Sequence, residues 1–214
     1  ARLLADLERL FLDTGRAIAA TIDAKDGYTH RHSERVAALA VRLARALGCS
    51  EREQRAIELA GLLHDLGKIA VPESILNKPD RLTDAEFEEM KKHPLHGVRI
   101  LSVIQNPQMA ELLPGIRAHH ERWDGSGYPQ GLRGEEIPLA GRVLAVADFL
   151  DALTSARSYR APLSLEEALA RLREGRGRQF DPRIVDRALE LHAQGELLPE
   201  PADAPDENPA TPPL

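Results

Sequence analysis

Apolar residues along this chain recur mainly every three or four positions, which is the spacing of a helix with one buried face. The first series predicts a long amphipathic helix over residues 2–23, with apolar positions at Leu3, Leu7, Leu10, Phe11, Ile18 and Ile22. A second series predicts a helix that Gly48 ends, with apolar positions at Val36, Leu39, Ala40, Leu43 and Leu47. Alternating apolar and polar runs, which are typical of strands, are not found in the sequence. The pattern therefore predicts an all-α fold.

Capping residues mark where several of these helices begin. A Ser or Thr followed three residues later by Glu forms a capping box, and the chain has such pairs at Ser50–Glu53, Thr83–Glu86 and Ser164–Glu167. The helix that begins after Ser50 is predicted to extend to about Gly67. Pro138 precedes a long apolar run over residues 139–153, which predicts a buried helix. A proline directly after Asp181 predicts the start of the last helix.

Two segments interrupt the helical pattern. Residues 123–129 contain glycines and a proline, which predict an ordered loop with a functional role. Residues 199–214 hold 6 of the 15 prolines together with several acidic residues, which predicts a solvated, disordered tail. We therefore predict three parts, namely an N-terminal connecting helix over residues 1–24, a helical domain over residues 25–198, and the tail.

Composition and charge exclude several classes of protein. The chain has 214 residues and a formal net charge of −6, unlike the basic surface that binds DNA or RNA, so we expect no nucleic-acid partner. No apolar stretch approaches the roughly 18 residues that span a bilayer. The single cysteine, Cys49, excludes an internal disulfide framework and favours a reducing, cytoplasmic compartment. The N-terminus lacks a secretory leader and opens within a helix, which suggests a piece of a longer protein.

Histidine and aspartate carry the candidate chemistry. Seven of the eight histidines lie between residues 30 and 120, mostly near predicted helix ends. His64 and Asp65 are flanked by leucines, and Asp148 lies within an apolar helix. A buried carboxylate is costly unless it is paired or binds a metal ion, and imidazoles with carboxylates suit zinc, iron or manganese. The same residues are compatible with a hydrogen-bonded core histidine beside a salt bridge, so this pattern alone leaves both interpretations open.

Two further features extend this candidate site. Lys68 follows Asp65 by three positions and shares its helix face, in a chain with only 5 lysines against 23 arginines. The scarcity of lysine favours a chemical role for Lys68, although a solvated cation at a helix end is the alternative. His119 and His120 stand directly before the loop over residues 123–129. An isolated pair of histidines is often a surface feature, but this pair adjoins a segment that is expected to be functional.

Read together, these residues resemble the HD-GYP family of the HD phosphohydrolase superfamily over about residues 20–190. The motifs that carry the resemblance are, in order, Tyr28-Thr29-x-x-His32-Ser33-x-Arg35-Val36, His64-Asp65-x-Gly67-Lys68-Ile69, His93-Pro94-x-x-Gly97, His119-His120-Glu121, Asp124-Gly125-x-Gly127-Tyr128-Pro129-x-Gly131-Leu132, Ala147-Asp148-x-x-Asp151-Ala152-Leu153 and Arg157-x-Tyr159-Arg160. Any one motif is weak on its own, but all of them in this order are highly specific.

The resemblance implies a fold, an activity and a metal centre. The fold is a multi-helix HD-type bundle with a Gly/Pro-rich active-site loop, and residues 25–198 form the catalytic domain. The activity is metal-dependent hydrolysis of the bacterial messenger cyclic di-GMP to pGpG, GMP or both. The cofactors are two divalent metal ions, with iron or manganese favoured and zinc also accepted. Tyr28 stands where some members have a glutamate that supports a third ion, so two ions are favoured.

The resemblance also implies roles for individual residues. The implied metal ligands are His32, His64, Asp65, His93, His119, His120 and Asp148. Asp65 would bridge the ions and act in catalysis with Lys68, which would stabilise charge on the phosphate or the leaving oxygen. Tyr128 would contact the nucleotide, and Arg157 and Arg160 would hold the second phosphate. His30 and His96 fall outside the ligand positions, and Cys49 is interpreted as structural.

The expected partners and the competing interpretations follow from the same resemblance. We expect a cyclic dinucleotide substrate, an upstream sensor or receiver domain joined through the first helix, and a homodimer. One alternative is an HD-superfamily hydrolase of another cyclic dinucleotide or of a nucleotide. The other alternative is a catalytically silent module that binds a partner or a ligand.

Overall fold

The computed structural model describes residues 2–26, 31–156 and 161–198, and over these ranges the fold is all-α, as predicted. The α-helices are α1 (Arg2–Lys25), α2 (His32–Ala46), α3 (Glu51–Leu63), α4 (Glu73–Leu76), α5 (Asp84–Met90), α6 (His93–Leu101), α7 (Pro107–Ala118), α8 (Leu139–Thr154), α9 (Leu165–Glu174) and α10 (Pro182–Ala193). Two 3-10 helices, η1 (Leu66–Ala70) and η2 (Gly134–Glu136), complete the described helical elements. The predictions for Tyr28, His30, Arg157, Arg160 and the tail lie outside the described residues.

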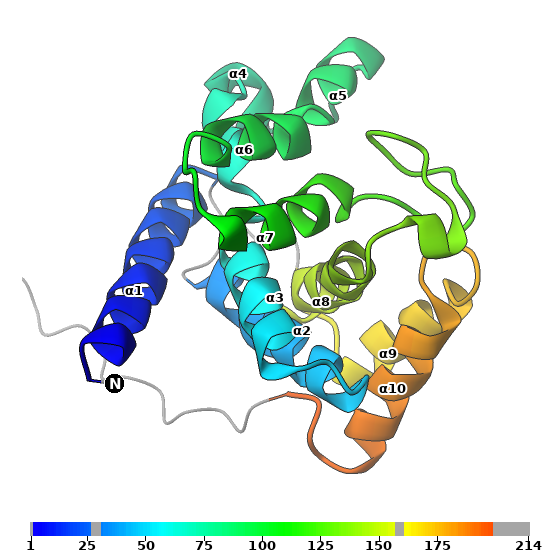
Figure 1. Cartoon of the computed structure of the whole chain (residues 1–214). Helices are drawn as coiled ribbons and strands as arrows, with labels where there is room; N and C mark the ends of the chain where they lie inside the picture. The colour runs from blue at the N-terminus through cyan, green and yellow to red at the C-terminus, as the bar shows by residue number, and fades with distance from the viewer. Residues whose placement is uncertain (1, 27–30, 157–160, 199–214) are drawn as a thin grey trace, which may run out of the picture.

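The centre of the bundle consists of α2, α3, α7 and α8. Helix α2 packs against α3 and α8, and α7 packs against α3, α6 and α8. In Figure 1, α1 lies along one side of this centre, α4 to α6 lie above it, and α9 and α10 lie on the opposite lower side. The apolar core includes Leu43 of α2, Ile116 of α7 and Leu144 of α8, all fully buried. The buried run over residues 139–153 therefore forms the expected core helix.

Most of the predicted helix ends are confirmed. Three helices begin with a complete capping box, at Ser50, Thr83 and Ser164. In each box, the hydroxyl group accepts the backbone N–H of the glutamate three residues later, and the carboxylate of that glutamate accepts the backbone N–H of the capping residue. A cap of this kind contributes about 0.5–2 kcal/mol. The carboxylate of Asp181 caps α10 by accepting the backbone N–H of Arg183, two residues later, and Gly48 follows the end of α2 with a φ of 80°. Local chemistry thus determines these boundaries.

One predicted boundary is wrong, because α3 ends at Leu63 and not near Gly67. The chain then turns through His64 and Asp65 and continues as the short 3-10 helix η1. The reason is tertiary packing, since η1 lies directly against α6. A Cβ atom on Gly67 would lie 1.8 Å from the carbonyl oxygen of His93 and 2.5 Å from the amide nitrogen of Gly97. The contact therefore requires a residue without a side chain.

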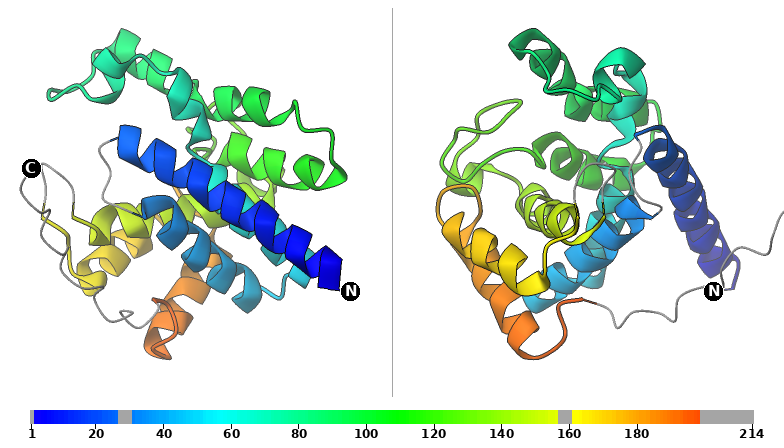
Figure 2. Two further views of the ribbon diagram at one scale, coloured as in Figure 1. Left: turned by 90° about the vertical axis from the view of Figure 1, so that its left-hand side faces the viewer. Right: turned by 180° about the vertical axis from the view of Figure 1, so that it is seen from behind.

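Helix α1 covers one face of the bundle and shares its core. Figure 2 shows α1 crossing the front of the molecule in the left-hand view. It packs against α2, α3 and η1, and its residues Ala19 and Ile22 are buried in the same apolar core as the central helices. No helix within the described ranges is long and apolar enough to cross a membrane. The domain boundary that we place after residue 24 stays a prediction.

The close approach of η1 to α6 leads to a first prediction, made with two facing glycines. Gly67→Ala should destabilise the protein by about 1–3 kcal/mol, because the new methyl group collides with the backbone of α6. Gly97→Ala is the matched control, because its methyl group would meet atoms no closer than 3.4 Å and would gain helix propensity. Chemical denaturation of both variants checks this. Equal stability of the two variants would show that the contact is not tight.

Candidate metal centre

The histidines and aspartates singled out in the sequence come from separate elements and meet at one place. They lie where helices begin or end, with the exception of one aspartate within α8. In chain order they are His32 at the start of α2, His64 and Asp65 between α3 and η1, His93 at the start of α6, His119 and His120 after α7, and Asp148 within α8. The packing of α2 on α8 and of α6 on both η1 and α7 brings these ends together.

The seven side chains form two adjacent groups of potential metal ligands. One group contains Asp65, His93, His119 and His120, and the other contains His32, His64 and Asp148. Within each group the ligand atoms lie within 4.8 Å of one another. His120 and Asp148 are half-buried and the other members are buried. The structure thus brings together every residue for which the sequence predicts metal binding.

Asp65 joins the two groups. Its Oδ2 atom lies 3.4 Å from Nε2 of His64, which belongs to the second group. Its Oδ1 atom lies 3.3 Å from Nε2 of His93 and 3.9 Å from Nε2 of His119, both in its own group. The two carboxylate oxygens therefore face different groups, which is the arrangement that a carboxylate bridging two ions requires.

Hydrogen bonds at Nδ1 determine which nitrogen of each ring faces inward. Nδ1 of His64 donates to the Gly61 carbonyl at 2.7 Å, and Nδ1 of His119 donates to the Ile116 carbonyl at 2.6 Å. Nδ1 of His93 donates in the same way to a backbone carbonyl, at 2.8 Å. A carbonyl oxygen only accepts, so the proton of each neutral ring is on Nδ1 and Nε2 carries a lone pair. Metal-binding histidines are oriented by outer hydrogen bonds of this kind.

The lone pairs on the inward-facing Nε2 atoms of the histidines lie close together, which favours a cation between them. Nε2 of His93 and Nε2 of His119 lie 3.3 Å apart, and both nitrogens are acceptors in the neutral rings. Burial, reinforced by neighbouring histidines, holds the pKa of His119 and of His120 well below its usual value, so these rings stay neutral. Nε2 of His64 is buried and makes no hydrogen bond to a described residue. This donor set fits a divalent metal ion better than it fits a proton.

Lys68 compensates the charge of Asp65. Burial alone would raise the pKa of Asp65, but the ammonium group of Lys68 contributes most to holding it well below the usual range, so the carboxylate stays ionised. The buried Nζ of Lys68 donates to Asp65 Oδ2 at 2.7 Å and to Asp26 Oδ2 at 2.6 Å. Burial raises the pKa of Asp26. The sequence analysis missed Asp26, because only the folded chain brings it to Lys68.

Asp151 orients the first histidine of the second group. Nδ1 of His32 donates to Asp151 Oδ2 at 2.7 Å, and Nε of Arg35 donates to Asp151 Oδ1 at 2.6 Å. Burial would raise the pKa of Asp151, but the hydrogen bonds from His32 and Arg35 lower it overall. The sequence analysis assigned Asp151 no role. Its position three residues after Asp148, in the same apolar helix, was the signal that could have found it.

Glu121 holds the Gly/Pro-rich loop against the site. Its buried carboxylate accepts the backbone N–H groups of Gln130 at 2.7 Å and Leu132 at 3.0 Å. The ring of Tyr128 stacks on the ring of His120, with centroids 4.8 Å apart and an interplanar angle of 29°. Tyr128, predicted to contact substrate, therefore lies beside the first ligand group.

Two histidines lie apart from these groups. His96 is half-buried on α6, and His192 lies near the end of α10. Neither belongs to a group of potential ligands. This agrees with the expectation that His96 falls outside the ligand positions.

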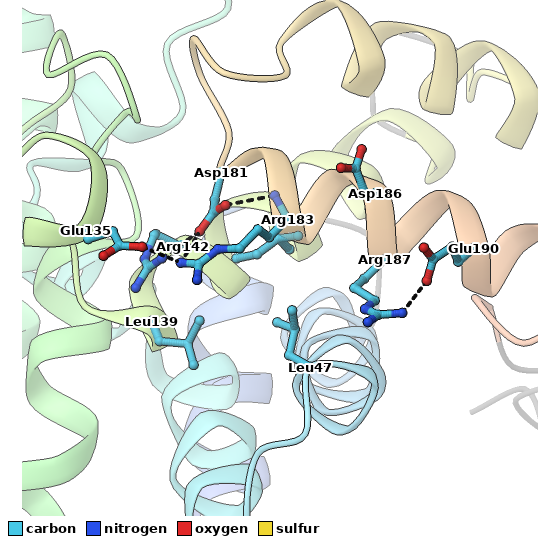
Figure 3. Close-up of a pocket in the computed structure, with 10 residues that line it drawn as sticks. Leu47, Glu135, Leu139, Arg142, Asp181, Arg183, Asp186, Arg187 and Glu190 are labelled. Carbon is cyan, nitrogen blue, oxygen red and sulfur yellow. Dashed lines mark hydrogen bonds and ion pairs between the residues drawn. The ribbon is translucent and has the colours of Figure 1, made fainter.

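A separate cavity of about 700 Å³ lies between the end of α2, η2, α8 and α10. Figure 3 shows that its arginines face acidic neighbours. Arg142 pairs with Asp181 at 2.6 Å, and Arg183 pairs with Glu135 at 3.0 Å. None of the seven potential ligands lines this cavity. Its charges are thus already compensated, and it adds no group to the metal centre.

Comparison with known proteins assigns the family. A model of the HD domain family matches residues 16–184. The chain belongs to the HD domain family, as its resemblance predicts.

Three curated relatives have informative names. The chain is 48% identical over 92% of its length to the cyclic di-GMP phosphodiesterase response regulator RpfG of Xanthomonas campestris, covering 53% of that protein. It is 45% identical over 79% of its length to a cyclic di-GMP phosphodiesterase of Thermotoga maritima, covering 46% of it. It is 40% identical over 88% of its length to the 3'3'-cGAMP-specific phosphodiesterase 2 of Vibrio cholerae, covering 36% of it. The chain thus spans about half or less of the length of these relatives.

A solved structure supports the fold. The crystal structure of a cyclic GMP-AMP-specific phosphodiesterase of Vibrio cholerae matches with a TM-score of 0.68 and 20% identity, covering 86% of this chain and 49% of that one. At this identity the match shows that the two proteins share the helical fold.

Replacement of the carboxylate behind His32 should weaken metal binding. Asp151→Asn replaces the carboxylate that accepts the hydrogen bond from Nδ1 of His32 with a neutral amide. We therefore expect the affinity for a divalent ion to fall about 10- to 100-fold. Titration of metal-free protein with Mn²⁺ in a calorimeter measures the change. Asp186→Asn is the control, because Asp186 forms only a surface ion pair with Arg176. An unaltered affinity in Asp151→Asn would show that Asp151 does not support a ligand.

Replacement of Glu121 should loosen the loop. In Glu121→Gln, an amide group replaces one acceptor oxygen, so one of the N–H groups of Gln130 and Leu132 loses its partner at a cost of about 1–3 kcal/mol. We expect faster hydrogen exchange at these two amides. Glu135→Gln, at an exposed position on η2, should leave their exchange rates unchanged. Identical exchange in both variants would show that Glu121 does not hold the loop.

Proposed function

We propose that this chain is a phosphodiesterase domain that hydrolyses cyclic di-GMP to pGpG, GMP or both. The observation that carries the proposal is the pair of adjacent ligand groups joined by the carboxylate of Asp65. The names of the two relatives at 45–48% identity support the substrate. The proposed catalytic domain covers residues 25–198, and the proposed function concerns this domain alone.

We propose that the two groups hold two divalent metal ions. His93, His119 and His120 would hold one ion, His32, His64 and Asp148 the other, and Asp65 would be shared. When bound to these residues, the ions would lower the pKa of a water molecule and would stabilise negative charge on the phosphoryl oxygens. Iron or manganese suits this mixture of imidazole and carboxylate, and zinc accepts the same ligands.

Lys68 supplies the positive charge next to the bridging carboxylate. Its contacts with Asp65 and Asp26 keep the ammonium group buried at the edge of the ligand groups. From this position, Lys68 is proposed to stabilise negative charge on the phosphate or on the leaving oxygen. The ion pair with Asp26 restrains the flexible lysine side chain, so its charge is already in place before the substrate binds.

The remaining assignments are also proposals. Tyr128 contacts the nucleotide from its position beside His120, and Arg157 and Arg160 hold the second phosphate. The name of the Xanthomonas relative, a response regulator, supports an upstream receiver or sensor domain. A homodimer through α1 and a cytoplasmic location complete the proposal.

A second candidate substrate is a hybrid cyclic dinucleotide. The relative from Vibrio cholerae named as 3'3'-cGAMP-specific is 40% identical to this chain, so the family resemblance alone does not select the bases. Hydrolysis of cyclic di-GMP, 3'3'-cGAMP, cyclic di-AMP and GTP by the metal-loaded protein decides between them. Fastest hydrolysis of cyclic di-GMP supports the proposal, and preferential hydrolysis of the triphosphate overturns it.

Removal of the shared carboxylate tests the metal centre and the activity together. Asp65→Ala should abolish hydrolysis of cyclic di-GMP and lower the bound metal below one ion per chain, because both groups lose their common ligand. Elemental analysis and product chromatography measure the two effects, and circular dichroism should show that the helices are retained. Asp186→Ala is the surface control. Full metal content and activity in Asp65→Ala would overturn the two-metal proposal, whereas an inactive wild-type protein without metal would favour a silent binding module.

A further inference from the structure

Helix α5 places an exposed aromatic side chain beside the active-site loop. The side chain belongs to Phe87, which is 47% exposed although it is large and apolar. Its ring meets the ring of Tyr128 edge to face, with centroids 6.4 Å apart and an interplanar angle of 81°. In Figure 1, the Gly/Pro-rich loop rises toward α5, which agrees with this contact. Phe87 is thus part of neither the apolar core nor the metal centre.

The contact extends a continuous series of rings that starts at the metal centre. His120 belongs to the first ligand group, Tyr128 stacks on His120, and Phe87 meets Tyr128. A substrate whose phosphate lies at the ligand groups would therefore have Tyr128 and then Phe87 next to it on this side. Aromatic side chains in such positions bind nucleobases by stacking, because every base has a flat π-face.

A lysine completes this surface. Nζ of Lys91 lies 5.5 Å from the centroid of Phe87 and 5.9 Å from the centroid of Tyr128. The side chain of Lys91 is 26% exposed, and it forms an ion pair with Glu88. Lys91 follows Phe87 by four residues, directly after the end of α5, and its ammonium group lies close to a base that stacks on the exposed side of Phe87. An ammonium group at a purine edge favours guanine, which presents the acceptors O6 and N7, over adenine, which presents an amino group.

The start of α5 is held firmly enough to position these side chains. Thr83 and Glu86 form a capping box, and Lys78 pairs with Glu86 at 2.6 Å. The hydrogen bond from Lys78, together with those from the backbone N–H and the hydroxyl group of Thr83, lowers the pKa of Glu86 to about 2, so the carboxylate stays ionised at neutral pH. The pair joins the segment before the helix to its first turn. Phe87 therefore projects from a helix that is fixed at its beginning, and Lys91 directly follows the end of that helix.

We propose that Phe87 and Lys91 form a base-recognition surface for the cyclic dinucleotide, with Phe87 stacking on a purine and Lys91 selecting guanine. The inference rests on the proposed phosphodiesterase function and specifies how that site would recognise its substrate. It extends substrate recognition from the Gly/Pro-rich loop to α5. An exposed phenylalanine beside a phosphodiesterase centre then has a physical reason, because substrate covers it during turnover.

Steady-state kinetics with cyclic di-GMP and cyclic di-AMP test the two roles. Phe87→Ala should raise KM for cyclic di-GMP about 5- to 100-fold through lost stacking, with a smaller effect on kcat, and Phe87→Trp should restore KM. Lys91→Ala should lower the preference for cyclic di-GMP over cyclic di-AMP about 5-fold or more. Leu95→Ala and Lys92→Ala are the matched controls, because they remove an exposed apolar and an exposed basic side chain from the neighbouring surface.

The experiment separates failure of this inference from failure of the proposed function. Hydrolysis of bis(p-nitrophenyl) phosphate, which has no purine, is measured in parallel with the wild-type protein. A wild-type protein that cleaves this ester but no cyclic dinucleotide overturns the proposed function. A wild-type protein that hydrolyses cyclic di-GMP, together with a Phe87→Ala variant of unchanged KM, overturns the stacking role alone. An unchanged base preference in Lys91→Ala overturns the selection of guanine.

Discussion

The arrangement of the whole bundle depends on keeping one carboxylate ionised in its interior. Burial raises the pKa of Asp65, and Lys68, three residues further along the chain, contributes most to lowering it well below the usual range. The histidines that face the two oxygens of Asp65 come from the ends of α3, α6 and α7, which meet at this point. A metal ion between the lone pairs of His93 and His119 would add the remaining positive charge that this geometry requires.

The helices hold the ligand groups through contacts that leave little freedom. Gly67 lets η1 lie against α6, which places Asp65, already paired with Lys68, next to His93. Backbone carbonyls and Asp151 orient the histidine rings from behind, so the Nε2 atoms need no rearrangement to bind an ion. Preorganisation of this kind lowers the entropic cost of assembling a metal site.

Local charge explains how an acidic protein could bind a substrate with two phosphates. The net charge of −6 belongs to the whole chain, and charges on the surface are screened beyond roughly 8–10 Å at physiological salt. The proposed ions, Lys68 and Lys91 would act at contact distance. The balance of charge at the site is therefore set by a few neighbouring groups and not by the sum over the chain.

The sequence by itself determined what depends on short-range chemistry. It predicted the helical class from apolar spacing, and it predicted the starts of α3, α5, α9 and α10 from Ser50, Thr83, Ser164 and Asp181, because capping involves neighbours along the chain. Its motifs also identified the seven residues that the structure brings together. The tertiary structure decided where α3 ends, which oxygen of Asp65 faces which histidine, and that Asp26, Asp151 and Phe87 lie beside the site. These features depend mainly on contacts between residues far apart in the chain, so they follow from packing between helices.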